Sequence, residues 1–446
     1  MRFLSTVLMV LLSLTMWSAA SSKRSFAQAL NVKLDDTLKP DERPAQALYE
    51  DANGYLGRRY QEFNKQKLPY DPKLEAQTRK EQQQLAVKNA GILKARSHLS
   101  NEDLYYLGML DHLAGNGDAA LTTMRELLKH DPDGLQAQTA RNIVVLYAVR
   151  KSLIDEANAT VTAYAHHQPQ SADDRYRMEL LITDFYSRAK DYASMNKHAQ
   201  QMLESAKEFG KRNKDQIFKR DDMLLKSSVL LADSYSKSNK KDLALKTFAD
   251  LRRLSLELPS GNLYKLATFS LGLLDPSLDI VKVFADGSAD SNAVPPEIVG
   301  SQWIDQAPVK LSELRGKVVL LDFWAHWCGP CRVTLPNLSR WHEAYKEKGL
   351  VILGLTEYYG HGDQRPMTPV EELAYLREFK KRNRLPYGVV VDEGEANSFN
   401  YGVNSIPMSF LIDRQGRLRY ISAGASAEEI ASLGRMIKKL VDEKTE

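Results

Sequence analysis

Two patterns of hydrophobic and polar residues divide the chain. Between about residues 40 and 275, apolar residues recur at helical spacing, glycines are few, and short polar turns interrupt the pattern. Beyond it, short apolar runs of strand length alternate with longer runs of helical periodicity. This alternation predicts an α/β layer fold whose sheet is at least partly parallel. The predicted strands and helices cover residues 317–324, 335–348, 350–356, 369–382, 388–392, 409–413, 418–422 and 427–441.

The helical region repeats its own pattern. Its clearest unit follows the frame of about 34 residues that is typical of a tetratricopeptide helix pair, in which small residues let two helices pack closely. That unit contains Leu104, Leu107, Gly108, Ala120, Met124, Leu127 and Pro132. Two further units are marked by Ala157, Val161, Tyr164 and Pro169, and by Leu231, Ala232, Tyr235, Ala244, Phe248 and Leu251. A weaker copy contains Ile182, Tyr186, Met195, Ala199 and Met202. We interpret the region as four degenerate repeats. An ordinary helical bundle is the alternative, because the signature tryptophan is missing from every copy.

The N-terminus has the pattern of an export signal. Arg2 precedes an apolar run at residues 3–17, and Ala27-Gln28-Ala29 is suited to a signal peptidase. The run is shorter than the roughly 20 residues that a membrane span needs, so an uncleaved anchor is the weaker alternative. We expect a soluble mature protein in the periplasm or another extracytoplasmic compartment.

The domain boundaries follow from these patterns and from a small, polar, glycine-containing stretch at 285–292, which precedes Pro295-Pro296 and predicts a linker. We predict a signal peptide at 1–29, a helical repeat domain at 30–280, a linker at 281–294 and an α/β domain at 295–446.

Composition and charge narrow the classes of function. Hydrophobic residues make up 43% of the chain and charged residues 26%, which is ordinary for a globular protein. The 61 basic residues nearly balance the 57 acidic ones, so we expect no nucleic-acid partner. The chain has only two cysteines, which excludes a disulfide framework and leaves the pair Cys328 and Cys331 to be explained.

The cysteine pair follows a run of buried-strand composition at 318–324. A helix is predicted to begin at Cys328, and the unpaired amide groups of a helix start stabilise a thiolate and lower its pKa below the free value of about 8.5. We therefore expect Cys328 to be the nucleophile. Cys331 stands close enough to resolve a mixed disulfide formed on Cys328.

The residues around the pair carry a specific resemblance. The run at 322–332, DFWAHWCGPCR, resembles the active site of thioredoxins. The stretch from about residue 295 to the C-terminus resembles the exported TlpA-like thiol-disulfide oxidoreductases, including LSELRGK at 311–317 and IPMSFLID at 406–413. The resemblance covers a third of the chain. It implies a thioredoxin-like domain, protein disulfide or dithiol substrates, a membrane electron donor and no cofactor.

The resemblance also implies roles for individual residues. Pro407 would be a cis-proline facing the two sulfurs, and Ile406 would offer backbone groups to an incoming substrate strand. Trp327 would shield the thiolate from solvent. With Gly329 and Pro330, between the cysteines, Ile406 and Trp327 are the predicted substrate contacts.

Two positions depart from the TlpA-like pattern. Thr334 stands where those proteins usually have an acidic residue, and Asp322 stands where they tend to have asparagine, at a position that is a buried aspartate in thioredoxins. Burial raises the pKa of a carboxyl group, so we assign to Asp322 the removal of the proton from Cys331. The alternative is a surface or salt-bridged aspartate without a catalytic part.

Other residues near the motif leave two interpretations open. His326 either raises the thiolate population or is an exposed loop residue without effect, and we favour the second interpretation. Glu357, Tyr358 and Tyr359, at the end of the next predicted strand, either border the substrate groove or pack in the core.

These observations favour a thiol-disulfide oxidoreductase acting on exported proteins, with a partner docked on the helical repeats. Gly329-Pro330 resembles the reducing thioredoxin sequence and favours the reducing direction. One alternative is a repeat scaffold carrying an accessory thioredoxin-like domain. A peroxiredoxin-type peroxidase is disfavoured because the residues before Cys328 do not match P-x-x-x-T-x-x-C, and a metal site is disfavoured because only His326 is close enough to add a ligand.

Overall fold

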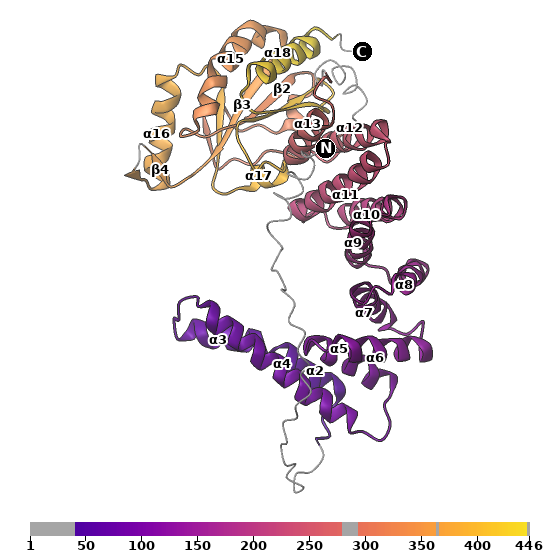
Figure 1. The fold of residues 1–446 in the computed structure, drawn as a ribbon. Helices are drawn as coiled ribbons and strands as arrows, with labels where there is room; N and C mark the ends of the chain where they lie inside the picture. Colours follow the sequence, from indigo (N-terminus) through magenta and orange to yellow (C-terminus); the bar gives the residue numbers. More distant parts are fainter. Residues whose placement is uncertain (1–40, 279–292, 363–364, 444–446) are drawn as a thin grey trace. The chain divides into compact units, whose positions relative to one another are not determined.

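The computed structural model describes residues 41–278, 293–362 and 365–443 (Figure 1). The predicted leader and nearly all of the predicted linker lie outside these residues. The chain divides into two compact units between Ser205 and Ala206. The second unit therefore contains the last helices of the helical region together with the α/β domain, and the division falls inside the predicted helical domain.

The first unit is helical throughout its described part. Its helices are α2 (Ala45–Asn53), α3 (Tyr55–Lys65), α4 (Pro72–Lys94), α5 (Asn101–Leu113), α6 (Gly117–His130), α7 (Ala137–Arg150), α8 (Ile154–His166) and α9 (Ala172–Ala189), and α10 (Tyr192–Arg212) runs on into the second unit. Side-chain oxygens mark several starts: Ser100 accepts a hydrogen bond from the Asp103 amide before α5, and Ser171 from the Asp174 amide before α9.

Each predicted repeat unit coincides with two consecutive helices, namely α5/α6, α7/α8, α9/α10 and, in the second unit, α11/α12. In the first pair all six marker residues from Leu104 to Leu127 are buried. A Cβ built on Gly108 would lie 2.7 Å from the terminal methyl of Met124. The small residue at that offset is thus what lets α5 and α6 approach, as the repeat pattern predicts.

The α/β domain is built on a mixed sheet of six strands in the order β1-β6-β3-β2-β7-β8. Strands β2 (Val318–Phe323), β3 (Leu350–Glu357) and β6 (Gly388–Asp392) are parallel, whereas β1 (Gln302–Ile304), β7 (Met408–Ile412) and β8 (Leu418–Ala423) join antiparallel. The short strands β4 (His361–Gly362) and β5 (Arg365–Pro366) form a separate hairpin. All six residues of β2 are buried, as expected for a central strand covered on both faces.

Helices cover both faces of this sheet. Helices α15 (Gly329–Tyr345) and α18 (Ala427–Asp442) pack against each other, and Figure 1 shows α17 (Ala396–Asn400) on the opposite side of the sheet. Helix α16 (Pro369–Arg382) connects β3 to β6. The thioredoxin-like α/β domain that the motif predicts is therefore present.

Three helices of the helical region belong to the same packed unit. They are α11 (Ile217–Lys237), α12 (Lys241–Glu257) and α13 (Gly261–Leu274), of which α12 and α13 pack on β8 and α11 on α17. Leu256 and Tyr264 are part of the hydrophobic core that contains β2. The first amides of α13 bond directly to the α/β domain, since Gly261 N donates to Tyr401 O and Asn262 N to Gly402 O, each at 2.9 Å.

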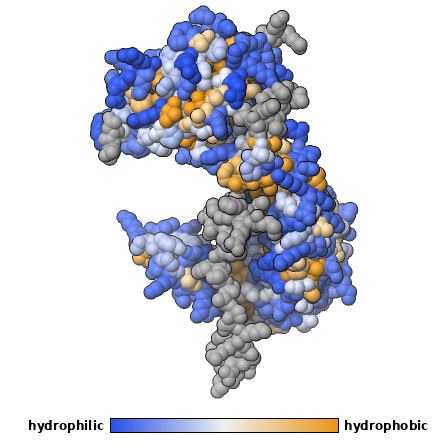
Figure 2. All heavy atoms as spheres, turned by 45° about the horizontal axis from the view of Figure 1, so that its top comes forward, coloured by the Kyte–Doolittle hydropathy of each residue, from blue (hydrophilic) through white to orange (hydrophobic). Residues whose placement is uncertain are grey.

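Hydrophilic residues cover most of the face shown in Figure 2, with smaller groups of hydrophobic residues between them. Within residues 41–278, 293–362 and 365–443, no helix combines the length and the apolar character that crossing a membrane requires. Large exposed apolar side chains in the second unit include Phe218 and Trp327.

Gly261 offers a test of how α13 packs on the sheet. A Cβ at this position would overlap the Met408 sulfur and lie 3.1 Å from the Phe410 ring, so Gly261→Ala should destabilise the second unit by about 1–3 kcal/mol through overpacking. Apart from Trp17 in the leader, every tryptophan of the chain (303, 324, 327 and 341) lies in this unit. Urea unfolding followed by tryptophan fluorescence therefore reports its stability. Gly394→Ala, at a site with nothing within 4 Å of the new Cβ, is the matched control. Equal midpoints for the two variants would contradict this packing.

Candidate functional site

The cysteine pair lies at the turn between β2 and α15. Cys328 is the N-cap of α15, and its sulfur accepts a hydrogen bond of 3.1 Å from the Cys331 amide. Pro330 occupies the first turn, where its missing amide costs no helical hydrogen bond. The two cysteines form a disulfide. The helix begins at the cysteine motif, as that motif predicts, and not at residue 335, where the predicted helical run begins.

The two sulfurs differ in access. Cys328 is 4% exposed and lines a cleft, whereas Cys331 is fully buried. The helix start places unpaired amide groups at Cys328, which stabilise negative charge on its sulfur when the disulfide is reduced. Cys328 is thus the sulfur that a ligand in the cleft can reach.

The residue before β7 is Pro407, and the Ile406–Pro407 peptide bond is cis, as predicted. Pro407 is buried, and its carbonyl oxygen accepts a hydrogen bond of 3.0 Å from the Gly424 amide. Ile406 lines the same cleft as Cys328.

Asp322 is a buried carboxyl group in the centre of the sheet. It pairs with Ser409 of β7 across the strands, and the Ser409 hydroxyl donates to its Oδ1 at 2.7 Å. Its Oδ2 is buried and has no hydrogen-bond partner in the described part of the chain. Burial raises the pKa of Asp322 to about 7, against the smaller lowering effect of the Ser409 hydrogen bond. Asp322 is therefore neither at the surface nor salt-bridged within the described residues, and its catalytic role stays a prediction.

His326 differs from the favoured expectation of an exposed loop residue, because it is 2% exposed. Its ring lies between side chains of distant elements, with ring centroids 5.1 Å from Tyr375 and 5.6 Å from His361, and its Nε2 is 3.6 Å from Glu372 Oε1. Burial lowers the pKa of His326, while Glu372 acts in the opposite direction.

Glu372 is a buried residue near the site that the sequence analysis missed. Its two carboxylate oxygens accept hydrogen bonds of 2.9 Å from the amides of Tyr359 and Gly360. These bonds fix the loop after β3 beside the cysteine turn. No local pattern distinguishes Glu372 from the exposed Glu371 next to it, since both lie in the first turn of α16.

Thr334, which departs from the TlpA-like pattern, makes a hydrogen bond within the first turns of α15. Its hydroxyl donates to the Cys331 carbonyl oxygen at 2.7 Å.

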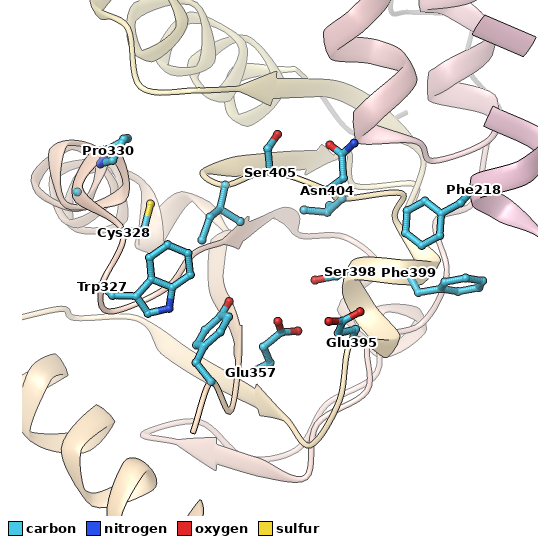
Figure 3. A pocket seen from close by; sticks show the side chains of 14 residues that line it. Phe218, Trp327, Cys328, Pro330, Glu357, Glu395, Ser398, Phe399, Asn404 and Ser405 are labelled. Carbon is cyan, nitrogen blue, oxygen red and sulfur yellow. The ribbon is translucent and has the colours of Figure 1, made fainter. Parts of the chain in front are cut away.

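A cleft of about 610 Å³ opens beside Cys328 (Figure 3). Its wall includes all four predicted substrate contacts, Trp327, Gly329, Pro330 and Ile406. Glu357 and Tyr359 also line the cleft, and Tyr358 is absent from its wall. Both tyrosines pack against the core, so Tyr359 does both. The wall residues that the sequence analysis missed are Phe218, Glu395, Ser398, Phe399, Val403, Asn404 and Ser405.

The side chains around the cleft differ in charge and exposure. Trp327 is 48% exposed and meets Tyr359 edge to face, with ring centroids 5.3 Å apart. Burial, with Glu395 and Asp392 nearby, raises the pKa of Glu357. The cleft thus combines aromatic side chains, carboxyl groups and one reachable sulfur.

Comparisons with known proteins show what the C-terminal part of the chain is similar to. The family model described as AhpC/TSA matches residues 296–421. Thiol-disulfide oxidoreductase ResA of Bacillus thuringiensis subsp. konkukian is 31% identical over 132 residues, which are 30% of this chain and 68% of ResA. Protein DipZ of Mycobacterium bovis is 33% identical over 147 residues, 31% of this chain and 20% of DipZ, so the chain spans about a fifth of that relative. A solved thiol-disulfide isomerase from Corynebacterium glutamicum is 26% identical and covers 34% of this chain and 99% of its own, with a TM-score of 0.30.

The raised pKa of Asp322 predicts how stability changes with pH. The folded state holds this proton up to about pH 7, whereas the unfolded chain releases it near pH 3.8. The contribution of the protonated Asp322 to the free energy of unfolding is therefore complete below pH 3.8. It decreases as the pH rises to about 7 and is then lost, by about 4 kcal/mol in total. Asp322→Asn removes the penalty, so the oxidised variant should be more stable than the wild type at pH 8 and the gap should close near pH 4. Urea unfolding of both proteins across this range is the measurement, and parallel pH dependences would contradict the buried carboxyl.

Proposed function

The chain belongs to the ResA family of thiol-disulfide oxidoreductases through its C-terminal domain, and on that premise we propose that it reduces disulfide bonds of exported proteins with the Cys328–Cys331 pair. The observation that carries this proposal is the N-cap sulfur of Cys328, beside a cleft that also contains the residue before a cis-proline. The GP dipeptide between the cysteines supports the reducing direction.

The first step is attack on the substrate. The Cys328 thiolate attacks one sulfur of a substrate disulfide, and a bond forms between Cys328 and that sulfur. The second substrate sulfur leaves as a thiolate and takes a proton from water. The helix start stabilises the attacking thiolate, and Ile406, ahead of cis-Pro407, offers its backbone to the substrate chain.

The second step releases the product. The Cys331 thiol gives its proton to the Asp322 carboxylate and attacks the Cys328 sulfur. The Cys328–Cys331 disulfide forms, and the remaining substrate sulfur leaves as a thiolate that is protonated from solvent. Two electrons have then passed to the substrate, and an external dithiol donor, which we expect at a membrane, must reduce the pair again.

Asp322 suits this transfer because its pKa of about 7 lies near neutral pH, where a general base is most effective. Its Oδ2 is buried without a hydrogen-bond partner among the described residues, so an oxygen is free to accept the proton.

The leader supports an extracytoplasmic location, where protein disulfides form. The repeat pattern supports docking of a peptide or protein partner on the helices, since stacked helix pairs offer an extended surface.

Substitution of each cysteine tests the assignment of roles. Cys331→Ala should accumulate a mixed disulfide between Cys328 and a protein substrate, because nothing resolves it, whereas Cys328→Ser should trap nothing and lose all reduction. Non-reducing electrophoresis and mass spectrometry of the adduct are the measurements. A Cys331→Ala variant that turns over without an adduct would contradict the scheme. Faster consumption of hydrogen peroxide than of protein disulfides by the reduced wild type would favour the peroxidase instead.

The proton transfer has its own test. Asp322→Asn should slow resolution of the mixed disulfide about tenfold or more at pH 7, since the variant has no base for the Cys331 thiol. The difference should shrink toward pH 9, where hydroxide in solution takes the Cys331 proton in place of the carboxylate. Stopped-flow decay of the mixed disulfide across this pH range is the measurement, and an unchanged profile would remove Asp322 from the reaction.

A further inference from the structure

Resting on the proposed reduction of protein disulfides, we infer that Phe218 and Phe399 form a recognition site for an apolar side chain of the substrate polypeptide. Phe218 lies on α11 and Phe399 on α17, and both line the cleft that contains Cys328. The site would select substrates by a side chain at a fixed number of residues from the reacting cysteine.

The two rings are arranged to receive such a side chain. Their centroids lie 5.2 Å apart with the planes at 78°, an edge-to-face pair. Phe218 is 44% exposed, although most of the residues that follow it in α11 are buried. An exposed phenyl ring in the wall of a cleft gains free energy when an apolar group covers it.

The aromatic pair is separated from the sulfur within one continuous cleft. Figure 3 shows Cys328 and Trp327 on one side, Phe218 and Phe399 on the other, and Asn404 and Ser405 between them. A polypeptide bonded to Cys328 and lying along residues 404–406 reaches the aromatic pair within a few residues, because an extended chain advances about 3.3 Å per residue.

Hydrogen bonds hold the Phe218 wall firmly against the α/β domain. On α11, the buried Asp221 accepts a hydrogen bond of 2.5 Å from the Ser260 hydroxyl at the N-cap of α13. At the cleft, Asn404 Nδ2 donates to Asn262 Oδ1 at 2.8 Å, and Lys265 Nζ donates to Ser405 Oγ at 2.9 Å. With the backbone bonds from α13 to Tyr401 and Gly402, these contacts preorganise the site, which lowers the cost of binding.

Phe218 lies outside the residues 296–421 that the family model matches. The selectivity it provides is therefore a property of the helical region of this chain, separate from the exchange chemistry.

The test uses the full chain and short glycine–serine peptides that carry one cysteine as a mixed disulfide with glutathione. A single leucine is moved through the peptide, position by position, on both sides of the cysteine. We expect the wild type to prefer one position by about tenfold in kcat/KM over the peptide without leucine, and Phe218→Ala to reduce that ratio to near one. Phe218→Leu should keep part of the preference.

Phe269→Ala is the matched control, because Phe269 is another exposed phenylalanine of this unit, 57% exposed on α13 and absent from the cleft wall. It should keep the wild-type ratio. A wild type without preference for any position, or a Phe218→Ala variant that keeps the preference, would overturn the inference.

Binding without chemistry separates this inference from the proposed function. The preferred peptide with serine in place of cysteine should bind the wild type more tightly than it binds Phe218→Ala, as measured by fluorescence anisotropy. If neither the wild type nor the variants reduce any peptide disulfide, the proposed function fails. The recognition site is then supported only if the wild type still binds the serine peptide more tightly than Phe218→Ala does. Equal binding by the two proteins would overturn the site itself.

Discussion

The hydrogen bond from the Cys331 amide to the Cys328 sulfur is the interaction on which the rest of the site depends. It exists because a fully buried central strand, β2, fixes the turn that follows it, so that Cys328 becomes the N-cap of α15. The sulfur therefore occupies the position where helix amides lack partners and where negative charge is favoured. Without this placement the pair would be two ordinary thiols, and neither the cleft nor the cis-proline would give them directed chemistry.

Asp322, on the strand that precedes the cysteine turn, is a buried carboxyl group, and its burial destabilises the folded protein when the group is ionised. The carboxyl group sits on the same strand, where the dry environment that raises its pKa also makes its ionised form unfavourable. Ser409 satisfies one oxygen and leaves the other unpaired in the described structure. A fully satisfied carboxylate would be more stable and a weaker base. The single hydrogen bond thus balances stability against basicity, a trade-off expected at functional sites.

Local sequence determined what could be predicted. The strand β3, predicted at 350–356, spans 350–357, and α16 has the predicted bounds of 369–382, because a capping box and proline at its start mark it clearly. The buried Asp322 and the cis Ile406–Pro407 bond were also accessible from the motif and its resemblance. The burial of His326 could not be predicted, because Glu372 and Tyr375, which bury it, lie on a later helix. The place of Phe218 in the cleft could not be predicted either, because it depends on how α11 packs on α17.

The residues proposed for the chemistry could be predicted from local sequence, whereas the residues of the cleft wall could not. The proposed exchange reaction uses Cys328, Cys331 and Asp322, which lie close together in the chain and form a compact sequence pattern. The cleft wall is assembled from α11, α17 and the segment before β7, which hydrogen bonds from α13 hold in place. If Phe218 recognises the substrate as inferred, a change on α11 would alter which substrates the cleft accepts without any contact with the sulfurs. A helical region that packs on a thioredoxin-like fold in this way would then redirect the proposed enzyme to new substrates while the reaction stays the same.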